Sequence, residues 1–148
     1  MSNRVFVVHG HDQHMREATA RLLSQLDLEP IILNEQPNSG RTLIEKFETY
    51  ADVGFAVVLL TADDVGAAVG QRDDLQPRAR QNVIFELGFF VGKLGRRRVC
   101  AVYQRGVEIL SDFQGVAYIP IDEAGGWRYQ VAKELKQAGL DVDMNKVG

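Results

Sequence analysis

Short, uninterrupted runs of apolar residues alternate along this chain with segments of helical periodicity, and this alternation limits the folds available to it. Residues 55–60, Phe-Ala-Val-Val-Leu-Leu, contain no polar residue, which is typical of a strand buried on both faces of a parallel sheet. Similar runs occupy residues 4–10, 30–33, 98–103 and 116–121. Strands that alternate with helices predict a parallel sheet covered by helices on both faces, with right-handed crossovers.

Local signals place helices between these runs. Asp12 can cap a helix that follows the first run, and Thr42 with Glu45 three residues later has the pattern of a capping box. Further helices are predicted over residues 81–94 and in a last amphipathic stretch that Gly139 ends. The resulting order of elements fits an α/β, flavodoxin-like fold with a five-stranded parallel sheet of strand order 2-1-3-4-5.

The composition is that of an ordinary folded domain. Of the 148 residues, 45% are hydrophobic and 25% are charged, values that argue against intrinsic disorder. This length favours a single domain. We expect it to cover residues 1–140, and we expect residues 141–148, which show no periodic pattern, to form a tail or linker.

Charge and cysteine content exclude several classes of partner and site. A formal net charge of −3 provides no general field for nucleic acid or anionic lipid, so neither is expected as a partner. Cys100 is the only cysteine, which excludes an intramolecular disulfide and a cysteine-based zinc cluster. The sequence shows no signal-peptide pattern and no apolar run long enough to cross a bilayer. We therefore expect a cytoplasmic protein.

The predicted topology indicates where a ligand would bind. In open parallel sheets, ligands lie beyond the carboxyl ends of the strands, near the point where the strand order reverses. Three polar segments fall there: residues 9–12, 34–41 and 61–80. The last is expected to be a long loop, and loops of that length inside a compact domain are usually functional.

The helix over residues 81–94 carries the most informative residue. Its apolar residues are distributed around nearly the whole circumference of the helix, which predicts that the helix is buried on most sides. Glu86 lies in its middle, where desolvation would raise the pKa of an unpaired carboxyl, and Asn82 shares its face. Gly88 and Gly92 suggest close packing against a strand or a ligand. Alternatively, Glu86 reaches a solvated edge or pairs with an arginine.

The turn after the first strand is a second candidate. Gly10 would let the backbone approach a ligand, and the free N–H groups of the next helix would attract a phosphate. A metal site built from His9, His11 and His14 is the weaker alternative, because no companion cluster of ligands stands elsewhere at metal spacing. The sequence also lacks a phosphate-binding glycine motif and a serine nucleophile elbow.

Four segments, in this order, resemble a known family. They are residues 5–12 (VFVVHGHD), 35–47 (EQPNSGRTLIEKF), 55–64 (FAVVLLTADD) and 80–88 (RQNVIFELG). They look like the bacterial TIR-like nucleotide-binding domain of effectors in cyclic-nucleotide antiphage signalling, often fused to a STING, SAVED or related sensor. The resemblance implies a TIR fold that hydrolyses NAD+ and depletes the cell of it once the domains self-associate. It also implies that residues 141–148 lead toward an absent sensor domain.

The resemblance also implies roles for individual residues. Glu86 is the implied catalytic residue, and NAD+ is a substrate, so no cofactor and no metal are expected. The expected substrate-binding residues lie at the predicted ligand end of the sheet and in the first turn of the 81–94 helix: Gly10, His11, Asp12, Arg41, Asp63, Arg80 and Asn82.

A single glutamate is chemically sufficient for this reaction. The nicotinamide of NAD+ is already cationic and leaves without a general acid, whereas an O-glycosidase would use two carboxylates. A carboxylate beside the ribose stabilises the oxocarbenium-like transition state, and aromatic loop residues could stack on the bases.

Three alternatives remain open from the residues. A nucleoside deoxyribosyltransferase-like enzyme has the same sheet order and also uses a glutamate on an N-glycosidic bond. A non-catalytic TIR interaction module would leave Glu86 with a structural role. A phosphoacceptor receiver domain is the weakest alternative, because Asp12 and Asp63 match it only loosely and no lysine follows at residues 117–120.

Overall fold

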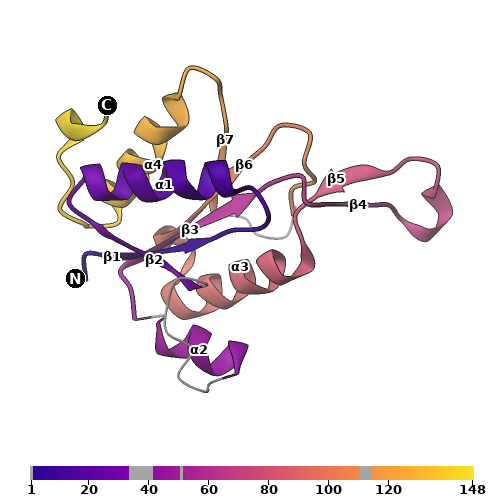
Figure 1. The fold of residues 1–148 in the computed structure, drawn as a ribbon, viewed down its shortest axis with the longest axis horizontal. Helices are drawn as coiled ribbons and strands as arrows, with labels where there is room; N and C mark the ends of the chain where they lie inside the picture. The colour runs from indigo at the N-terminus through magenta and orange to yellow at the C-terminus, as the bar shows by residue number, and fades with distance from the viewer. Residues whose placement is uncertain (1, 34–41, 51, 111–114) are drawn as a thin grey trace.

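The computed structural model describes residues 2–33, 42–50, 52–110 and 115–148. Its centre is an all-parallel sheet of five described strands in the order β2-β1-β3-β6-β7 (Figure 1). Counted along the chain, this is the order 2-1-3-4-5, so the predicted α/β, flavodoxin-like architecture is confirmed. The strands are β1 (Arg4–Val8), β2 (Glu29–Ile32), β3 (Phe55–Leu60), β6 (Val99–Tyr103) and β7 (Ala117–Pro120).

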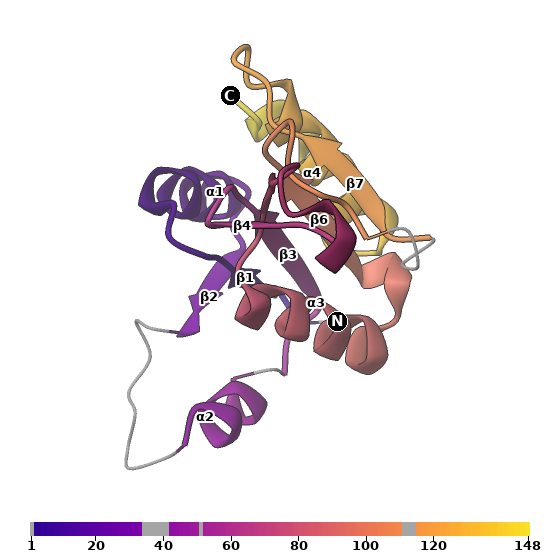
Figure 2. The same ribbon diagram turned by 90° about the vertical axis from the view of Figure 1, so that its right-hand side faces the viewer.

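Helices cover both faces of this sheet (Figures 1 and 2). The helices α1 (Gln13–Gln25) and α4 (Gly126–Gln137) lie on one face, and α2 (Leu43–Thr49) and α3 (Gln81–Leu94) lie on the other. Side chains of β3 alternate between the two resulting cores. Phe55, Val57 and Leu59 pack toward α1 and α4, whereas Ala56, Val58 and Leu60 pack toward α3. All six are buried, as the sequence predicts for a central strand.

The two predicted helix caps are confirmed. The Oδ1 atom of Asp12 accepts a hydrogen bond from the Met15 amide at 3.0 Å, at the start of α1. The Thr42 hydroxyl accepts from the Glu45 amide at 3.2 Å, and the Glu45 carboxylate accepts from the Thr42 amide at 3.4 Å. Each cap satisfies amides that the first turn of a helix leaves without an intrahelical partner.

The segment over residues 61–80, which the sequence predicts to be a long loop, contains regular structure. It contains an antiparallel hairpin of β4 (Asp64–Gly66) and β5 (Gln76–Arg78), with the 3-10 turn η2 (Val69–Gln71) between them. The hairpin extends away from the body of the domain, beyond the carboxyl ends of the central strands (Figure 1). Strands of three residues are too short to give a readable alternation, which explains the error.

The helix α3 is also less buried than predicted. Its buried residues are Val83, Leu87 and Phe90, whereas the Phe85 side chain is 59% exposed. A Cβ atom built on Gly92 would meet no described atom within 4 Å, so the expected close packing is not found at this glycine. High apolar content therefore does not mean burial on all sides here.

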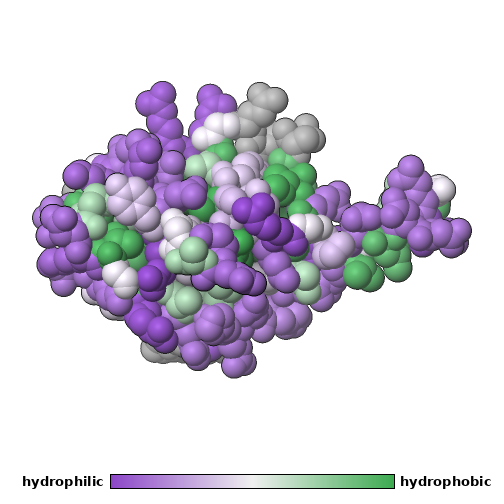
Figure 3. Space-filling view, turned by 90° about the horizontal axis from the view of Figure 1, so that it is seen from above, coloured by the Kyte–Doolittle hydropathy of each residue, from purple (hydrophilic) through white to green (hydrophobic). Residues whose placement is uncertain are grey.

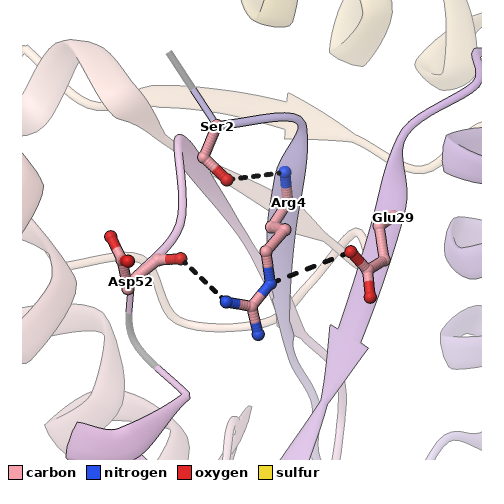
Figure 4. Close-up of polar contacts among 4 residues, drawn as sticks. All are labelled: Ser2, Arg4, Glu29 and Asp52. Atoms are coloured by element: carbon pink, nitrogen blue, oxygen red, sulfur yellow. Dashed lines mark hydrogen bonds and ion pairs between the residues drawn. The ribbon is translucent and has the colours of Figure 1, made fainter.

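The amino ends of the strands are joined by Arg4, on the edge of the sheet opposite the hairpin. Its Nε atom lies 3.8 Å from the Oε2 atom of Glu29, and its guanidinium donates to the Asp52 carbonyl at 3.4 Å (Figure 4). The Ser2 hydroxyl accepts from the Arg4 amide at 3.1 Å. These contacts link β1 to the edge strand β2 and to the segment before β3.

The final residues are folded against the domain. Val142 is buried, Met144 and Val147 pack against the α1–α4 core, and residues Met144–Lys146 form the 3-10 turn η4. Lys146 forms an ion pair with Asp27, after α1. Residues 141–148 thus have structure that their sequence did not indicate. None of the helices described here is both long and apolar enough to cross a membrane.

Candidate functional site

The candidate site lies where β1 and β3 end. These strands are parallel neighbours, and Val8 at the end of β1 pairs with Val58. Their carboxyl ends therefore meet at one edge of the sheet, with the loop of residues 9–12 beside the start of the 61–80 segment. Figure 2 views the molecule from this side, with the hairpin and the start of α3 toward the viewer.

The Asp63 carboxylate connects three segments at this edge. Its Oδ1 atom accepts hydrogen bonds from the His11 amide at 3.0 Å and from the Thr61 hydroxyl at 2.9 Å. Its Oδ2 atom accepts from the Arg80 amide at 3.3 Å, immediately before α3. One side chain thereby fixes the β1 loop and the beginning of α3 relative to the end of β3. A carboxylate also interacts favourably with the positive end of the helix dipole.

Gly10 has a specific reason to be glycine. A Cβ atom built there would lie 1.9 Å from the Oδ2 atom and 2.5 Å from the Cγ atom of Asp63. The Asp63 carboxylate, in its present position, leaves no room for such an atom. The space left by Gly10 is therefore occupied by the Asp63 carboxylate, where the sequence suggested a ligand.

Glu86 lies in the second turn of α3, on the flank that faces β1. Phe90, one turn further along, packs its ring on Phe6 of β1 with centroids 4.7 Å apart. Burial raises the pKa of the Glu86 carboxyl to about 7, against a smaller lowering by the positive charge of Arg80. Because α3 begins at the carboxyl end of the sheet, Glu86, Arg80 and the Asp63 network belong to one region of the molecule.

The remaining predicted residues are placed differently. Asp12 caps α1 through its carboxylate, and His11 contributes its amide to Asp63 while its side chain is exposed. Asn82 is exposed one turn before Glu86. Arg41, and with it the predicted loop 34–41, lies outside the described residues. The binding roles of these residues stay predictions.

Sequence reasoning missed Thr61. This residue is only 2% exposed, and its hydroxyl holds the carboxylate that organises the site. A polar residue directly after a fully apolar strand was the available signal. His9 is also engaged locally, since its Nδ1 atom donates to the Gly10 carbonyl at 2.9 Å. Within the described residues, no group of three or more His, Cys, Asp or Glu side chains is arranged to hold a metal ion.

The arrangement offers a carboxyl group that is easily neutralised, beside an arginine and the amino end of a helix. Such an end attracts anions such as the phosphates of a nucleotide. A carboxylate in a partly desolvated position can stabilise a developing positive charge more strongly than it could in water. The site therefore suits a ligand that carries anionic groups, which the helix end attracts, and that develops positive charge at another atom during the reaction, which the carboxylate stabilises.

Residues 4–123 match the model of the family described as CAP12/Pycsar effector protein, TIR domain. The chain is 47% identical over 147 residues to the Escherichia coli (strain K12) protein named "Uncharacterized protein YuaY", covering 99% of this chain and 49% of that protein.

Other relatives have functional names. The Pycsar effector protein XpPycTIR of Xanthomonas perforans is 42% identical over 100 residues, which is 66% of this chain and 30% of that protein. The CD-NTase-associated protein 12 of Flavobacterium daejeonense is 34% identical over 100 residues, 64% of this chain and 31% of that protein. This chain thus spans about half or less of the length of these relatives.

Proposed function

Because this chain belongs to the CAP12/Pycsar effector TIR domain family, we propose that it is an NAD+ glycohydrolase that acts as an antiphage effector. The observation that carries the proposal is Glu86, a carboxyl group with a pKa raised by burial at the carboxyl end of the sheet. Perturbed groups of this kind concentrate at functional sites. The names of the relatives support the effector role, and the choice of NAD+ rests on the family resemblance and on the chemistry of the site.

The proposed reaction breaks one N-glycosidic bond. The bond between C1′ of the ribose and the nicotinamide nitrogen breaks, and its electron pair leaves with nicotinamide, which becomes neutral. Water then adds to C1′ and loses a proton, giving ADP-ribose. Ionised Glu86 faces the positive charge that develops on the ribose and accepts hydrogen bonds from its hydroxyl groups.

The neighbouring residues have supporting roles in this proposal. Arg80 favours the ionised form of Glu86 and offers a positive charge to a phosphate. The Asp63 network holds the β1 loop and the start of α3, so it positions the predicted contacts of Gly10, His11 and Asn82. In the whole protein, we propose that a cyclic-nucleotide sensor domain triggers self-association of this domain. This self-association controls the reaction.

The proposal is tested by product analysis. Concentrated protein, or protein clustered on a multivalent support, is incubated with NAD+, and free nicotinamide and ADP-ribose are measured. A parallel reaction holds a deoxynucleoside and a different free base. Nicotinamide release without base exchange supports the proposal. Base exchange would favour the deoxyribosyltransferase alternative, and the absence of both reactions when the domain is clustered would favour an interaction module.

A further inference from the structure

A cavity of about 250 Å³ lies on the side of α3 that faces away from Glu86. It lies between the first turn of α3, the end of β5 and the segment that follows β6. Its described lining residues are Arg78, Ala79, Gln81, Ile84, Glu108 and Leu110. Ile84 precedes Glu86 by two residues, and side chains with this spacing point to nearly opposite sides of a helix with 3.6 residues per turn. The cavity is therefore separate from the proposed position of the reacting bond.

Hydrogen bonds hold the walls of this cavity in place. The Glu108 amide donates to the Pro77 carbonyl at 2.9 Å, which ties the segment after β6 to β5. The Tyr118 hydroxyl donates to the Leu110 carbonyl at 3.3 Å, which ties the same segment to β7. The cavity is thus built into the fold, as binding sites for small molecules usually are.

Arg78 is the most informative residue of the cavity. The hairpin of β4 and β5 projects from the domain (Figure 3), and Arg78 is the last residue of β5. Its guanidinium lies against Gly66, since a Cβ atom built on Gly66 would lie 2.5 Å from Nη1 and 2.7 Å from Cζ. Its Nε atom is buried, and among the described residues it has neither a hydrogen-bond partner nor an ion-pair partner. Because buried polar groups are normally paired, an arginine without a polar partner is expected where a bound molecule supplies the acceptor.

The lining of the cavity indicates the chemistry of its ligand. Ile84 and Leu110 are partly buried against the core and offer apolar walls to a flat ring. Arg78 provides hydrogen-bond donors, Glu108 provides a carboxylate acceptor, and the amide of Gln81 can do both. A heterocyclic base combines an apolar ring with donors and acceptors at its edge. The volume is below the ~300–1,000 Å³ of sites for drug-sized molecules, which suits one base and not a whole dinucleotide.

We propose, building on the NAD+ glycohydrolase activity proposed above, that this cavity binds the adenine base of NAD+. In that activity the nicotinamide ribose lies beside Glu86, on the opposite flank of α3. The amino end of α3 lies between the two positions and attracts the phosphates that join the two halves of the dinucleotide. A helix with its side chains is about 10–12 Å across, a width that an extended dinucleotide spans. The substrate thus passes around the first turn of α3.

Neighbouring residues at the start of α3 face the two positions. The positive charge of Arg80 acts on the Glu86 carboxyl group. Arg78 and Gln81, which lie close to Arg80 in the sequence, line the cavity instead. There the amino group of adenine can donate to Glu108, and its ring nitrogens can accept from Arg78. Binding energy from this distant part of the substrate would hold the reacting bond near Glu86.

Nicotinamide mononucleotide tests the proposal, because it keeps the bond that breaks and lacks the adenosine half of NAD+. Arg78→Met keeps an unbranched side chain against Gly66 and removes the donors. We expect this variant to lose about ten-fold in kcat/KM for NAD+, the effect of one hydrogen bond to a charged group, and to keep the wild-type kcat/KM for the mononucleotide. Arg72→Met, an exposed change in the same hairpin, should match wild type with both substrates. Equal losses for both substrates, or no loss for either, would overturn the proposal.

Binding of adenosine monophosphate separates this proposal from the proposed activity, because this nucleotide contains adenine and no bond to nicotinamide. At about 10 mM, well above the ~1 mM Kd of a weak complex, it should shift the NMR resonances of the Ile84 and Leu110 amides. Ribose 5-phosphate, which lacks the base, should leave the Leu110 amide unshifted.

The two ligands give outcomes that decide between the proposals. If adenosine monophosphate shifts neither amide, or if ribose 5-phosphate shifts Leu110 equally, the base site is wrong even in an active enzyme. Shifts specific to adenosine monophosphate in a chain that releases no nicotinamide would support the base site and count against the proposed activity. In Arg78→Met, the Kd for adenosine monophosphate should rise about ten-fold.

Discussion

Glu86 carries an energetic cost in the folded chain because burial favours its neutral form. The pKa of its carboxyl is raised from 4.5 to about 7. Between these values the folded state retains a proton that the unfolded state has released. Stability therefore falls as the pH rises from about 4.5 to about 7 and stays lower above that range. A residue that weakens the fold at neutral pH is expected where function requires it.

Glu86→Gln should remove this pH-dependent cost. We expect the free energy of unfolding of wild type, relative to this variant, to fall by about 1–2 kcal/mol between pH 4.5 and pH 8, less than the full shift because Glu86 is partly exposed. Urea denaturation of both proteins across this range measures the difference, in which the other titrating groups cancel. A difference that does not change with pH would show that Glu86 is not desolvated in solution.

Gly10 and Asp63 should prove coupled. Gly10→Ala places a methyl group where the Asp63 carboxylate lies and should displace it from its donors, lowering stability by roughly 1–3 kcal/mol. In an Asp63→Ala background the same substitution should cost little, because the clash is gone. A double-mutant cycle by thermal or urea denaturation measures this coupling. Additive effects would mean that the two residues do not contact each other.

At the level of elements, substitutions of the α1 cap residue Asp12 distinguish a structural role from a binding role. Asp12 accepts from the Met15 amide, and it is also a predicted substrate contact. Asp12→Ala should lower stability by about 1 kcal/mol, whereas Asp12→Asn keeps a capping oxygen and should retain stability. Thermal denaturation measures both. The KM of Asp12→Asn for NAD+ then tests the binding role. A raised KM with unchanged stability would show that the charge of Asp12 contributes to NAD+ binding, whereas an unchanged KM would leave Asp12 with the cap alone.

Element prediction succeeded where local chemistry decides the structure. The apolar run 55–60 could only be a central strand, and the Thr42–Glu45 pair carries its own hydrogen bonds. It failed for the hairpin, whose short strands have no periodic signal, and for the burial of α3, which depends on where its neighbours lie. Glu86 could be predicted as a site residue from its apolar neighbours in the sequence. The Asp63 network could not be predicted, because it depends on a contact between residues 52 positions apart.

At the level of the whole molecule, the two edges of the sheet have different roles. The amino-end edge is linked by Arg4, and residues 141–148 pack against the α1–α4 core. The carboxyl-end edge carries the Asp63 network, next to the helix that contains Glu86. The β4–β5 hairpin projects from the same edge (Figure 1). The proposed control of the reaction by self-association would act at this carboxyl-end edge.

The dilute domain should accordingly have weak activity that rises steeply with concentration or forced clustering. Mass action populates an assembled form as the concentration increases, and in our proposal this form is the active one. Nicotinamide release measured across a dilution series, together with the mass of the protein, tests this. Specific activity that stays constant over about a hundred-fold dilution, with a monomeric protein throughout, would argue against control by assembly.

The most direct test of the account is nicotinamide release by Glu86→Gln, measured per folded molecule beside its melting temperature. The variant keeps the size of the side chain and removes the charge that would face the oxocarbenium ion. We predict a rate at least about 10²-fold below wild type, with a melting temperature that is unchanged or slightly higher at neutral pH. Glu17→Gln, an exposed change on α1, should match wild type in both measurements. A Glu86→Gln protein that melts several degrees lower yet retains full activity per folded molecule would contradict the assignment of Glu86 as the catalytic residue.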